Sequence, residues 1–382
     1  MKLTFFAGVV PTSPTFFRRV CLVAKHLIKK GYSIQILCLS QSYYRTMKEE
    51  TPSELNIEFV GQYHHDIRYR RTHLLFYVPE LLKIAIRSLK CIVSFRPHAV
   101  HIFTAHPSSL LLLVVLRFFG YRVYIDLDDL NSTQAQAAGY SRIAVRIYSA
   151  LEKTIPSFAR KVTVCSHYLQ KKYPGSILLP NMYDKEDFSH LPIRSDRKRG
   201  WTTVIYLGMM GLYHGEKEII KCIPSMLNQE KKLRFVFIGW GEDEADARAL
   251  ARHLKISRYI RFTGRIPYRR AVKWLSRSDI GLLPMEDTSL FRARHPLKML
   301  DYMAAGVCCL ASNVGEARHF IKNRFSGILV PPGDMSELSQ KIVYLSHHPA
   351  IRERIAQEGQ KAISVLEVGR HIHRWASLYR NS

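Results

Sequence analysis

Residues 296–306 read Pro-Leu-Lys-Met-Leu-Asp-Tyr-Met-Ala-Ala-Gly, which predicts a helix that begins at a proline and ends at a glycine. Proline suits the first turn of a helix because its missing N–H has no partner there, and glycine commonly follows the last turn. Apolar runs at 280–283 and 307–311 predict a strand on each side of this helix. A strand, a helix and a second strand form a βαβ unit, the building block of parallel sheets.

The same alternation extends outward to both ends of the chain. In the first half it predicts strands at 3–7, 33–39, 99–103, 122–127, 162–164 and 177–179, and helices at 17–30, 79–95 and 107–119. In the second half it predicts strands at 203–207, 235–238, 260–262 and 327–330, and helices at 216–227, 245–254 and 269–276. We therefore expect an α/β fold of two doubly wound halves, with ligands bound at the carboxyl ends of the strands in a shared cleft.

The boundary between the halves is expected in a polar, basic stretch. Residues 189–200 read Ser-His-Leu-Pro-Ile-Arg-Ser-Asp-Arg-Lys-Arg-Gly, a composition typical of a linker. The predicted domains are residues 1–190 and 201–366, joined by a linker at 191–200. Residues 367–382, which contain Trp375, are expected to pack back on the first domain.

Composition limits the class of protein. The chain has 382 residues, with 57 Lys and Arg against 31 Asp and Glu, a net charge of +26 that indicates a polyanionic partner. Its seven cysteines are scattered without a C-x-x-C pair, which excludes a disulfide framework or zinc ribbon and favours a reducing, cytoplasmic compartment. No signal peptide is evident, and the longest apolar run is far shorter than a membrane span.

The start of the helix at 296–306 has the chemistry of an anion site. Free backbone N–H groups and the positive end of the helix dipole favour a phosphate there. Lys298 in the first turn opposes the dipole, and a bound anion would explain its presence. Asp301, one turn further on, has two oxygens that can accept hydrogen bonds from a ribose diol. An ordinary amphipathic helix is the alternative interpretation.

These motifs, in their order along the chain, resemble the retaining family 4 glycosyltransferases, which have the GT-B fold of two facing Rossmann-like domains. The resemblance rests on Leu-Pro-Asn-Met-Tyr-Asp at 179–184, Tyr-Leu-Gly-Met-Met at 206–210, Gly-Trp-Gly-Glu at 239–242, Phe-Thr-Gly-Arg-Ile-Pro at 262–267, Ser-Asp-Ile-Gly-Leu-Leu-Pro at 278–284, the helix at 296–306, and Gly-Ile-Leu-Val-Pro-Pro-Gly-Asp at 327–334. It covers nearly the whole chain.

The resemblance implies a binding site for a nucleotide-sugar donor, linked to UDP or GDP, in the second domain. Arg265 and Gly264 would hold the base, the helix start would hold the diphosphate, and Asp301 would hold the ribose where the family usually has Glu. The implied donor-binding residues are Gly208, His214, Gly239, Gly241, Gly264, Arg265, Arg294, His295, Pro296, Leu297, Lys298 and Asp301.

The chain also departs from the family pattern. The family's first glutamate falls at Ala293, and His214 stands where a lysine is usual. The flanking Arg292, Arg294 and His295 suggest that this loop contacts a more anionic group, or reads the donor differently. The first loop, residues 8–19, lacks the family's usual glycine pair, so direct backbone contact with the diphosphate is less secure there.

Candidate catalytic residues follow the strand at 122–127. The sequence Asp-Leu-Asp-Asp at 126–129 stands where the family commonly presents His-Asp, so we expect Asp126 or Asp128 near the anomeric carbon or as base toward the acceptor, with Asp129 beside them. A D-x-D motif also occurs in metal-dependent GT-A enzymes. Two Rossmann-like halves favour GT-B, in which a helix dipole and cations neutralise the diphosphate, so we expect no metal and no cofactor. A salt-bridged strand end is the structural alternative.

The charge excess concentrates in the first domain. Residues 63–96 are rich in cations and aromatic side chains, and the cations of the helix at 79–95 share one face. This pattern is typical of a helix that lies on an anionic membrane, although nucleic-acid binding or a core helix with a solvated face uses the same ingredients. The candidate acceptor or membrane contacts are Arg18, Arg19, Arg68, Arg70, Arg71, Lys83 and Arg87.

The sequence therefore predicts a metal-independent retaining glycosyltransferase. It would transfer a hexose or N-acetylhexosamine to a glycan or lipid-linked acceptor in polysaccharide or glycoconjugate synthesis, at the inner face of the membrane. The alternative is a nucleotide-sugar-binding subunit without transfer activity, motivated by Ala293 and the missing histidine. A nucleic-acid partner is not expected.

Overall fold

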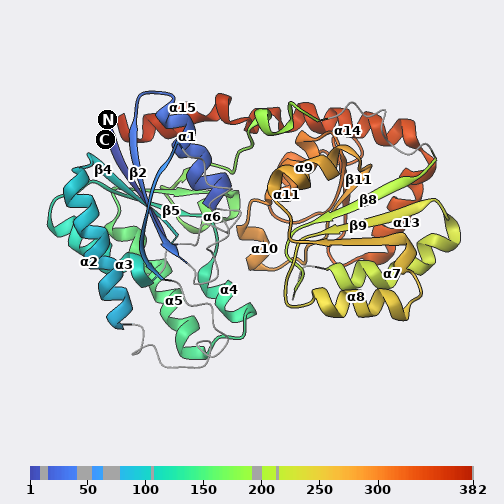
Figure 1. The fold of residues 1–382 in the computed structure, drawn as a ribbon, viewed down its shortest axis with the longest axis horizontal. Helices are drawn as coiled ribbons and strands as arrows, with labels where there is room; N and C mark the ends of the chain where they lie inside the picture. The colour runs from blue at the N-terminus through green and yellow to red at the C-terminus, as the bar shows by residue number, and fades with distance from the viewer. Residues whose placement is uncertain are drawn as a thin grey trace. The chain divides into compact units, whose positions relative to one another are not determined.

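The computed structural model describes residues 1–8, 16–40, 54–62, 78–104, 107–191, 200–211 and 215–380. The chain divides into two compact units (Figure 1). Unit 1 comprises Met1–Met182, Ala293–His295 and Val368–Ser382, and unit 2 comprises Tyr183–Arg292 and Pro296–Glu367. The first boundary lies at 182, before the predicted linker, because the Tyr183 N–H donates to the Leu366 carbonyl of unit 2 at 3.2 Å.

Unit 1 is built on a seven-stranded parallel sheet of order β3-β2-β1-β4-β5-β6-β7. Its strands are β1 (Lys2–Ala7), β2 (Ser33–Ser40), β3 (Asn56–Gln62), β4 (Ala99–Phe103), β5 (Val123–Leu127), β6 (Lys161–Val164) and β7 (Ile177–Leu178). Its helices are a π-helical turn (Phe16–Cys21), α1 (Leu22–Ile28), α2 (Val78–Phe95), α3 (Pro107–Phe118), α4 (Asn131–Ala137), α5 (Arg142–Thr154), α6 (His167–Lys172) and α15 (Val368–Arg380).

Unit 2 is built on a six-stranded parallel sheet of order β10-β9-β8-β11-β12-β13. Its strands are β8 (Thr202–Leu207), β9 (Leu233–Ile238), β10 (Ile260–Gly264), β11 (Ile280–Leu283), β12 (Cys308–Ser312) and β13 (Ile328–Val330). Its helices are α7 (Glu216–Gln229), α8 (Glu244–His253), α9 (Tyr268–Ser276), α10 (Ser289–Ala293), α11 (Leu297–Ala304), α12 (Ala317–Phe320), α13 (Met335–His347) and α14 (Pro349–Ile363). The last residue of α10, Ala293, already lies in unit 1.

Each sheet has a hydrophobic core on both faces, as parallel sheets require. In unit 1, successive residues of β1 point to opposite sides: Phe5 packs with α1 and α15, whereas Phe6 packs with α2 and α3. In unit 2, Val204 of β8 faces α7 and α13, and Ile205 faces α9 and α11. The order 3-2-1-4-5-6 in both sheets is that of a doubly wound dinucleotide-binding fold, with switch points at β1/β4 and β8/β11.

Among the helices of the described ranges, none is both long enough and apolar enough to cross a bilayer.

Candidate functional site

Three glycine-containing loops meet at the carboxyl edge of the unit 2 sheet. A Cβ at Gly239 would lie 1.8 Å from the Gly208 carbonyl oxygen, and one at Gly241 would lie 1.7 Å from the Met210 carbonyl oxygen. Backbone hydrogen bonds join the loops, since the Gly239 N–H donates to the Gly264 carbonyl at 3.1 Å. These glycines are required because any side chain would push the loops apart.

Lys298 lies beside the first of these loops. A Cβ at Gly208 would lie 3.0 Å from the Lys298 Nζ, so the ammonium group sits directly over the end of β8. The same Nζ lies 4.3 Å from the centre of the Tyr206 ring, a cation–π distance. Lys298 is the second residue of α11, so it lies at the N-terminal end of this helix, where the helix dipole is positive. The β8 loop, an ammonium group and a helix N-terminus thus form one cationic cradle at the β8/β11 switch point.

Asp301 is positioned by a tyrosine. It lies one turn after Lys298, is only 4% exposed, and its Oδ1 accepts a hydrogen bond from the Tyr268 hydroxyl at 2.8 Å. A second tyrosine, Tyr302, ties α11 to the sheet, because its hydroxyl accepts from the Leu207 N–H and donates to the Leu282 carbonyl. The α11 start is therefore held rigidly against the ends of β8 and β11.

An aromatic side chain that the sequence reasoning did not single out lies in the same cluster of loops. Trp240 is 48% exposed, and the Arg265 guanidinium stacks over its ring at 5.6 Å. The sequence feature that could have indicated this residue is a tryptophan between two glycines, at 239–241. His214, predicted to assist the phosphate contact, lies outside the described residues.

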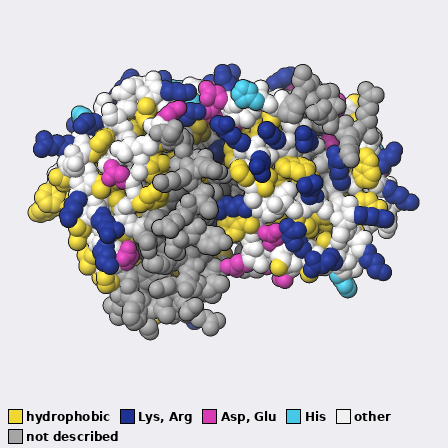
Figure 2. Space-filling view, in the orientation of Figure 1, with side chains coloured by type: hydrophobic (Ala, Val, Ile, Leu, Met, Phe, Trp, Pro, Cys, Tyr) yellow, Lys and Arg dark blue, Asp and Glu magenta, His cyan; other side chains and the backbone are white. Residues whose placement is uncertain are grey.

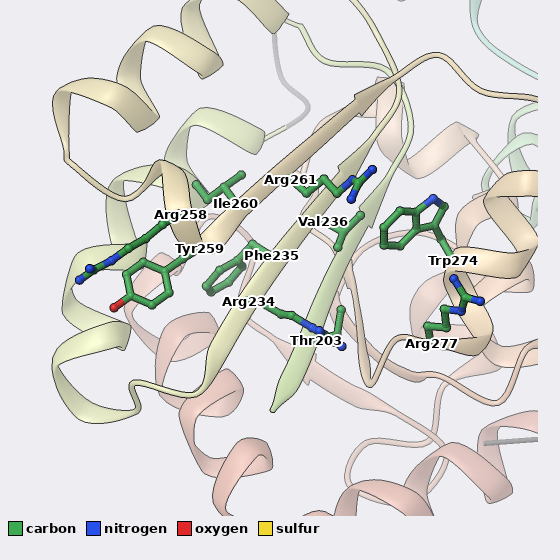
Figure 3. Close-up of a pocket in the computed structure, with 10 residues that line it drawn as sticks. All are labelled: Thr203, Arg234, Phe235, Val236, Arg258, Tyr259, Ile260, Arg261, Trp274 and Arg277. Carbon is green, nitrogen blue, oxygen red and sulfur yellow. The ribbon is translucent and has the colours of Figure 1, made fainter. Parts of the chain in front are cut away.

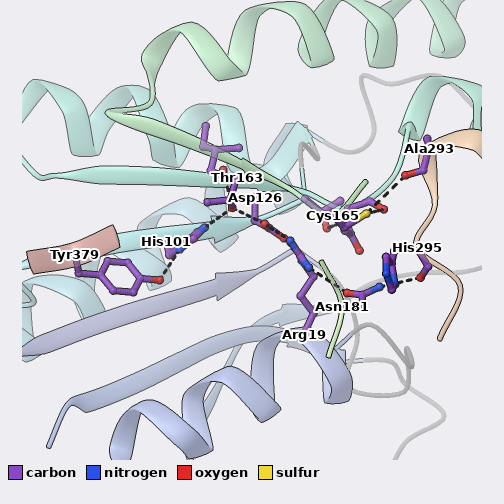
Figure 4. Close-up of polar contacts among 12 residues, drawn as sticks. Arg19, His101, Asp126, Thr163, Cys165, Asn181, Ala293, His295 and Tyr379 are labelled. Atoms are coloured by element: carbon purple, nitrogen blue, oxygen red, sulfur yellow. Dashed lines mark hydrogen bonds and ion pairs between the residues drawn. The ribbon is translucent and has the colours of Figure 1, made fainter. Parts of the chain in front are cut away.

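A second polar cluster lies in unit 1 and is centred on Asp126. Its carboxylate is fully buried and forms a bidentate ion pair with Arg19, in which Nη2 donates to Oδ1 at 2.7 Å (Figure 4). The Thr163 hydroxyl also donates to this carboxylate. Burial lowers the pKa of Arg19, but the charge and hydrogen bonds of Asp126 raise it by more, so the pKa lies above its ordinary value and Arg19 stays charged.

The prediction that Arg18 and Arg19 face an anionic acceptor is corrected by their burial. Arg19 is 1% exposed and Arg18 is 7% exposed, with an Arg18 Nη2 donating to the Met182 carbonyl at 3.3 Å. Both residues belong to the π-helical turn that precedes α1, and π-helical turns often occur at functional sites. Their guanidinium groups therefore contact other groups of unit 1 and are not open to solvent.

A continuous chain of polar contacts runs through this cluster, as Figure 4 shows. His101 Nδ1 lies 2.6 Å from the Tyr379 hydroxyl of α15, and Thr163 connects His101 to Asp126. On the other side, Arg19 donates to the Asn181 Oδ1, and the Asn181 amide donates to the His295 carbonyl at 2.9 Å. Burial lowers the pKa of His101 to about 4, so its ring is neutral at physiological pH. The α15 helix and the 293–295 segment are thus anchored to the same ion pair.

Asp128 is the carboxylate best placed to react in this cluster. It is half-buried beyond the end of β5, and its Oδ1 accepts from the Thr104 hydroxyl at 3.2 Å. Burial, followed by the charges of Asp126 and Asp129, raises the pKa of Asp128 to about 6. Asp126 is fully engaged by Arg19 and Thr163, so the predicted catalytic role falls more naturally on Asp128 than on Asp126.

The loop that precedes α11 differs from its expected donor-binding role. Arg294 forms an ion pair with Asp129 at 2.8 Å, and Arg292 forms one with Asp287 at 2.6 Å. His295 is 3% exposed, and burial lowers its pKa to about 3. Ala293 is fully buried in unit 1, where its carbonyl accepts from the Ser166 hydroxyl at 2.6 Å. This segment therefore anchors the chain in unit 1, and its cations are balanced by carboxylates.

The basic helix predicted in the first domain is present as α2. Ile84, Ser88 and Ile92 form its buried face, while Lys83 and Arg87 are exposed. Large apolar side chains are also exposed on this helix: Val78, Leu82, Ile86 and Val93. Arg68, Arg70 and Arg71 lie outside the described residues.

Two doubly wound parallel units, one with a cationic cradle and the other with a carboxylate cluster, define the GT-B class of fold. The whole chain superimposes on sucrose-phosphate synthase from Thermosynechococcus elongatus with a TM-score of 0.81 at 16% identity, covering 100% of this chain and 99% of that one. It also superimposes on Anabaena Alr3699/HepE in complex with UDP-glucose, with a TM-score of 0.78 at 14% identity and complete coverage of both. The predicted fold class is confirmed.

Residues 191–362 match the family model described as Glycosyl transferases group 1. Among curated proteins, the phosphatidyl-myo-inositol mannosyltransferase of Mycobacterium leprae is 23% identical over 192 residues, 49% of this chain and 49% of that protein. The chain spans about half the length of such curated relatives.

Proposed function

We propose that this protein is a retaining glycosyltransferase that moves a sugar from a nucleotide-sugar donor to a glycan or lipid-linked acceptor. The observation that carries the proposal is the placement of Lys298, at the N-terminus of α11, over the glycine loop that ends β8. The match of residues 191–362 to the group 1 family model and the UDP-glucose complex of the structurally similar Anabaena protein support it. A UDP- or GDP-linked sugar is the substrate class that such a cradle fits.

In this proposal each part of the unit 2 site binds one part of the donor. Lys298 and the positive N-terminal end of α11 bind the diphosphate and stabilise its charge as the sugar leaves. Asp301, oriented by Tyr268, accepts hydrogen bonds from the ribose hydroxyls. Arg265 and Trp240 hold the base by stacking and backbone contacts.

Asp128 acts on the acceptor. The acceptor oxygen bonds to the anomeric carbon while the bond from that carbon to the diphosphate oxygen breaks, and the acceptor proton passes to the Asp128 carboxylate. A pKa of about 6 leaves Asp128 mostly ionised at neutral pH and still basic enough to take a proton. Lys298 and the helix dipole supply the positive charge, so we propose that no metal is required.

The first test removes the Lys298 ammonium group. We expect Lys298→Met to lower kcat/KM by about 100- to 1,000-fold, the usual cost of losing a group that stabilises a developing negative charge. The measurement is transfer and donor hydrolysis with a panel of UDP-, GDP- and dTDP-sugars. Lys322→Met, which removes a charge elsewhere in unit 2, is the matched control and leaves the rate unchanged. Equal rates for wild type and Lys298→Met would contradict the proposed donor site.

A binding subunit without transfer activity is the second candidate, favoured by the buried Ala293 in place of a glutamate. Donor binding without transfer or hydrolysis for any donor in the panel would support it. Transfer with one donor would exclude it.

We further propose that α2 attaches the protein to an anionic membrane face on the cytoplasmic side. Its exposed side combines Leu82 and Ile86, 45% and 54% exposed, with Lys83 and Arg87. The neighbouring α3 ends at Phe118 and is followed by Phe119, 85% and 63% exposed. Apolar side chains of this size among cations are typical of an interfacial helix.

The membrane proposal is tested by flotation with vesicles that contain phosphatidylglycerol. We expect Leu82→Glu/Ile86→Glu to lower the bound fraction at least fivefold, because two charges replace inserted apolar groups. Ile143→Glu, at a residue 71% exposed on α5, is the control and retains binding. Loss of binding in the control alone would locate the contact elsewhere.

A further inference from the structure

One stretch of unit 2 carries many cations and no acidic residue, and most of these cations lie outside the proposed donor site. Residues 247–278 contain ten Lys and Arg and no Asp or Glu. Nine of the ten cationic side chains are exposed, and Arg248 is half-buried. Figure 2 shows Lys and Arg side chains gathered over unit 2. This concentration of charge in unit 2 adds to the one that the sequence predicts in the first domain.

This surface is hollowed at the edge strand β10. A cavity of about 480 Å³ is lined by Thr203, Arg234, Phe235, Val236, Arg258, Tyr259, Ile260, Arg261, Trp274 and Arg277 (Figure 3). A second cavity of about 390 Å³ adjoins it, because both share Ile260 and Arg261. Volumes of this size are typical of small-ligand sites.

The larger cavity is at the opposite edge of the sheet from the donor cradle. Thr203 and Arg234 are the second residues of β8 and β9, and Ile260 and Arg261 are the first two of β10. The donor loops begin at the other ends of the same strands. Gly208 is five positions after Thr203, which in an extended strand is a distance of about 16 Å. The cavity is therefore a distinct place on unit 2.

Most of its guanidinium groups are held in position by neighbouring side chains. Arg234 Nε donates to the Thr203 hydroxyl at 2.6 Å, Arg258 stacks over the Tyr259 ring at 4.9 Å, and Arg261 stacks over the Trp274 ring at 5.1 Å. In Figure 3, Arg261, Trp274 and Arg277 lie at one end and Arg258 at the other, with Arg234 between them. A guanidinium that lies on an aromatic ring keeps N–H groups at its rim, which suits two-point contact with a phosphate.

The carboxylate that contacts Thr203 does not line the cavity. Asp279 is 3% exposed, accepts from the Thr203 backbone N–H at 2.8 Å, and pairs with the buried Arg352. Four arginines without a carboxylate among the ten lining residues leave a strongly positive concavity. Holding like charges together is unfavourable, and an anionic ligand would reverse that cost.

We propose that this arginine cavity binds a small phosphorylated ligand, such as a sugar phosphate or a nucleotide, at a site separate from the donor cradle. The observations favour a soluble ligand over a bilayer. Residues 247–278 are all described and expose no large apolar side chain that could insert into lipid, in contrast to α2. The concave shape and the fixed guanidinium groups fit a compact anion.

The test uses inorganic pyrophosphate as the probe, titrated calorimetrically into the full chain at constant ionic strength. We expect Arg261→Gln/Arg277→Gln to weaken binding at the arginine cavity at least tenfold. Lys255→Gln/Lys273→Gln removes the same charge from the same surface outside both cavities and is expected to change affinity less than twofold. Arg234→Gln/Arg258→Gln, which shares no residue with the first pair, gives an independent cavity variant if that pair unfolds, and a melting curve checks every variant.

Lys298→Met separates this proposal from the proposed function. Pyrophosphate binding that persists in Lys298→Met and disappears in the cavity variant supports the arginine cavity, whether or not the donor cradle also binds. Three results would overturn the proposal. The wild type binds no pyrophosphate, Lys298→Met abolishes all pyrophosphate binding, or the Lys255→Gln/Lys273→Gln control loses as much affinity as the cavity variant. Flotation with phosphatidylglycerol vesicles is the second arm: a cavity variant that loses vesicle binding but keeps pyrophosphate binding would identify a membrane contact and overturn the proposal.

Discussion

Thr104 adopts a backbone conformation that β-branched residues rarely occupy. Its φ is 78°, immediately after β4 at the β1/β4 switch point, and its hydroxyl donates to the Asp128 carboxylate. Left-handed conformations of this kind cost about 1–3 kcal/mol and persist where the surrounding structure fixes them. The N–H of Thr104 donates to the Asp126 carbonyl at 2.9 Å, which is part of that fixation. We infer that strain at Thr104 is retained because it aligns Asp128.

The pH dependence of transfer tests this alignment. If Asp128 is the proposed base, its ionised form is the active one, so the rate is expected to fall as pH decreases through about 6, and Asp128→Asn is expected to be inactive. The Thr104 hydrogen bond lowers the pKa of Asp128, so Thr104→Gly is expected to move the acid limb to higher pH. It is also expected to stabilise the fold by about 1 kcal/mol by relieving the strain. Thr104→Ser keeps the hydroxyl and should keep the wild-type profile; an unshifted limb in Thr104→Gly would contradict the role.

At the scale of single elements, α7 carries a destabilising carboxylate at its start. Glu216 is 1% exposed, neither of its oxygens has a hydrogen-bond partner within the described part of the chain, and burial raises its pKa to about 7. The folded state therefore binds more protons than the unfolded state between the ordinary pKa of 4.5 and about 7, and stability decreases as pH rises through this window. The loss is complete above pH 7.

Glu216→Gln removes this titration. We expect the variant to be more stable than wild type at pH 8, by on the order of 1–3 kcal/mol, with a smaller difference at pH 5. Urea unfolding at the two pH values measures it. Glu218→Gln changes an exposed carboxylate of the same helix and should alter stability little; an equal gain for both variants would point to net charge as the cause.

Element by element, the sequence predicted the alternation of strands and helices but missed the strand β3 and the helices α4, α5, α13 and α14. The strand β3 was not predicted because it contains Asn56 and Gly61, and asparagine and glycine are uncommon in strands. Gly61 is there because a Cβ would lie 2.3 Å from Ile84 Cγ1, so α2 packs directly on the backbone. Glycine-rich loops and the α11 start could be located from local patterns. The burial of Arg19 could not, because its partners Asp126 and Asn181 are 107 and 162 residues away in sequence.

At the scale of the whole molecule, the core of unit 1 depends on the segment that follows unit 2. Trp375 of α15 is fully buried, stacks near His101 and Phe103, and has the Arg19 guanidinium 5.3 Å from its ring. We expect Trp375→Ala to destabilise unit 1 by about 3–5 kcal/mol, the usual cost of emptying a core tryptophan site.

Calorimetry is the measurement for this prediction, because two units of this size can give separate transitions. The unit 1 transition should shift to lower temperature in Trp375→Ala while the unit 2 transition stays. Trp201→Ala, at a residue 40% exposed in unit 2, is the control and should shift neither by more than a few degrees. A uniform shift of both transitions in Trp375→Ala would show that the loss is not confined to unit 1.

The passage of the chain between the units at 182, 292, 295 and 367 also determines the order in which the protein can fold during synthesis. Chains fold from the N-terminal side as they emerge, and domains generally fold as units. Unit 1 lacks the 293–295 segment until residues 183–292 of unit 2 have been made, and it lacks α15 until all of unit 2 has been made. The apolar face around Phe5 and Phe103, on which α15 packs, is therefore not covered before then. Unit 2, complete at residue 367, is the part that can fold first. A nascent chain arrested before α15 would therefore present an unfinished N-terminal half to chaperones beside a finished second half.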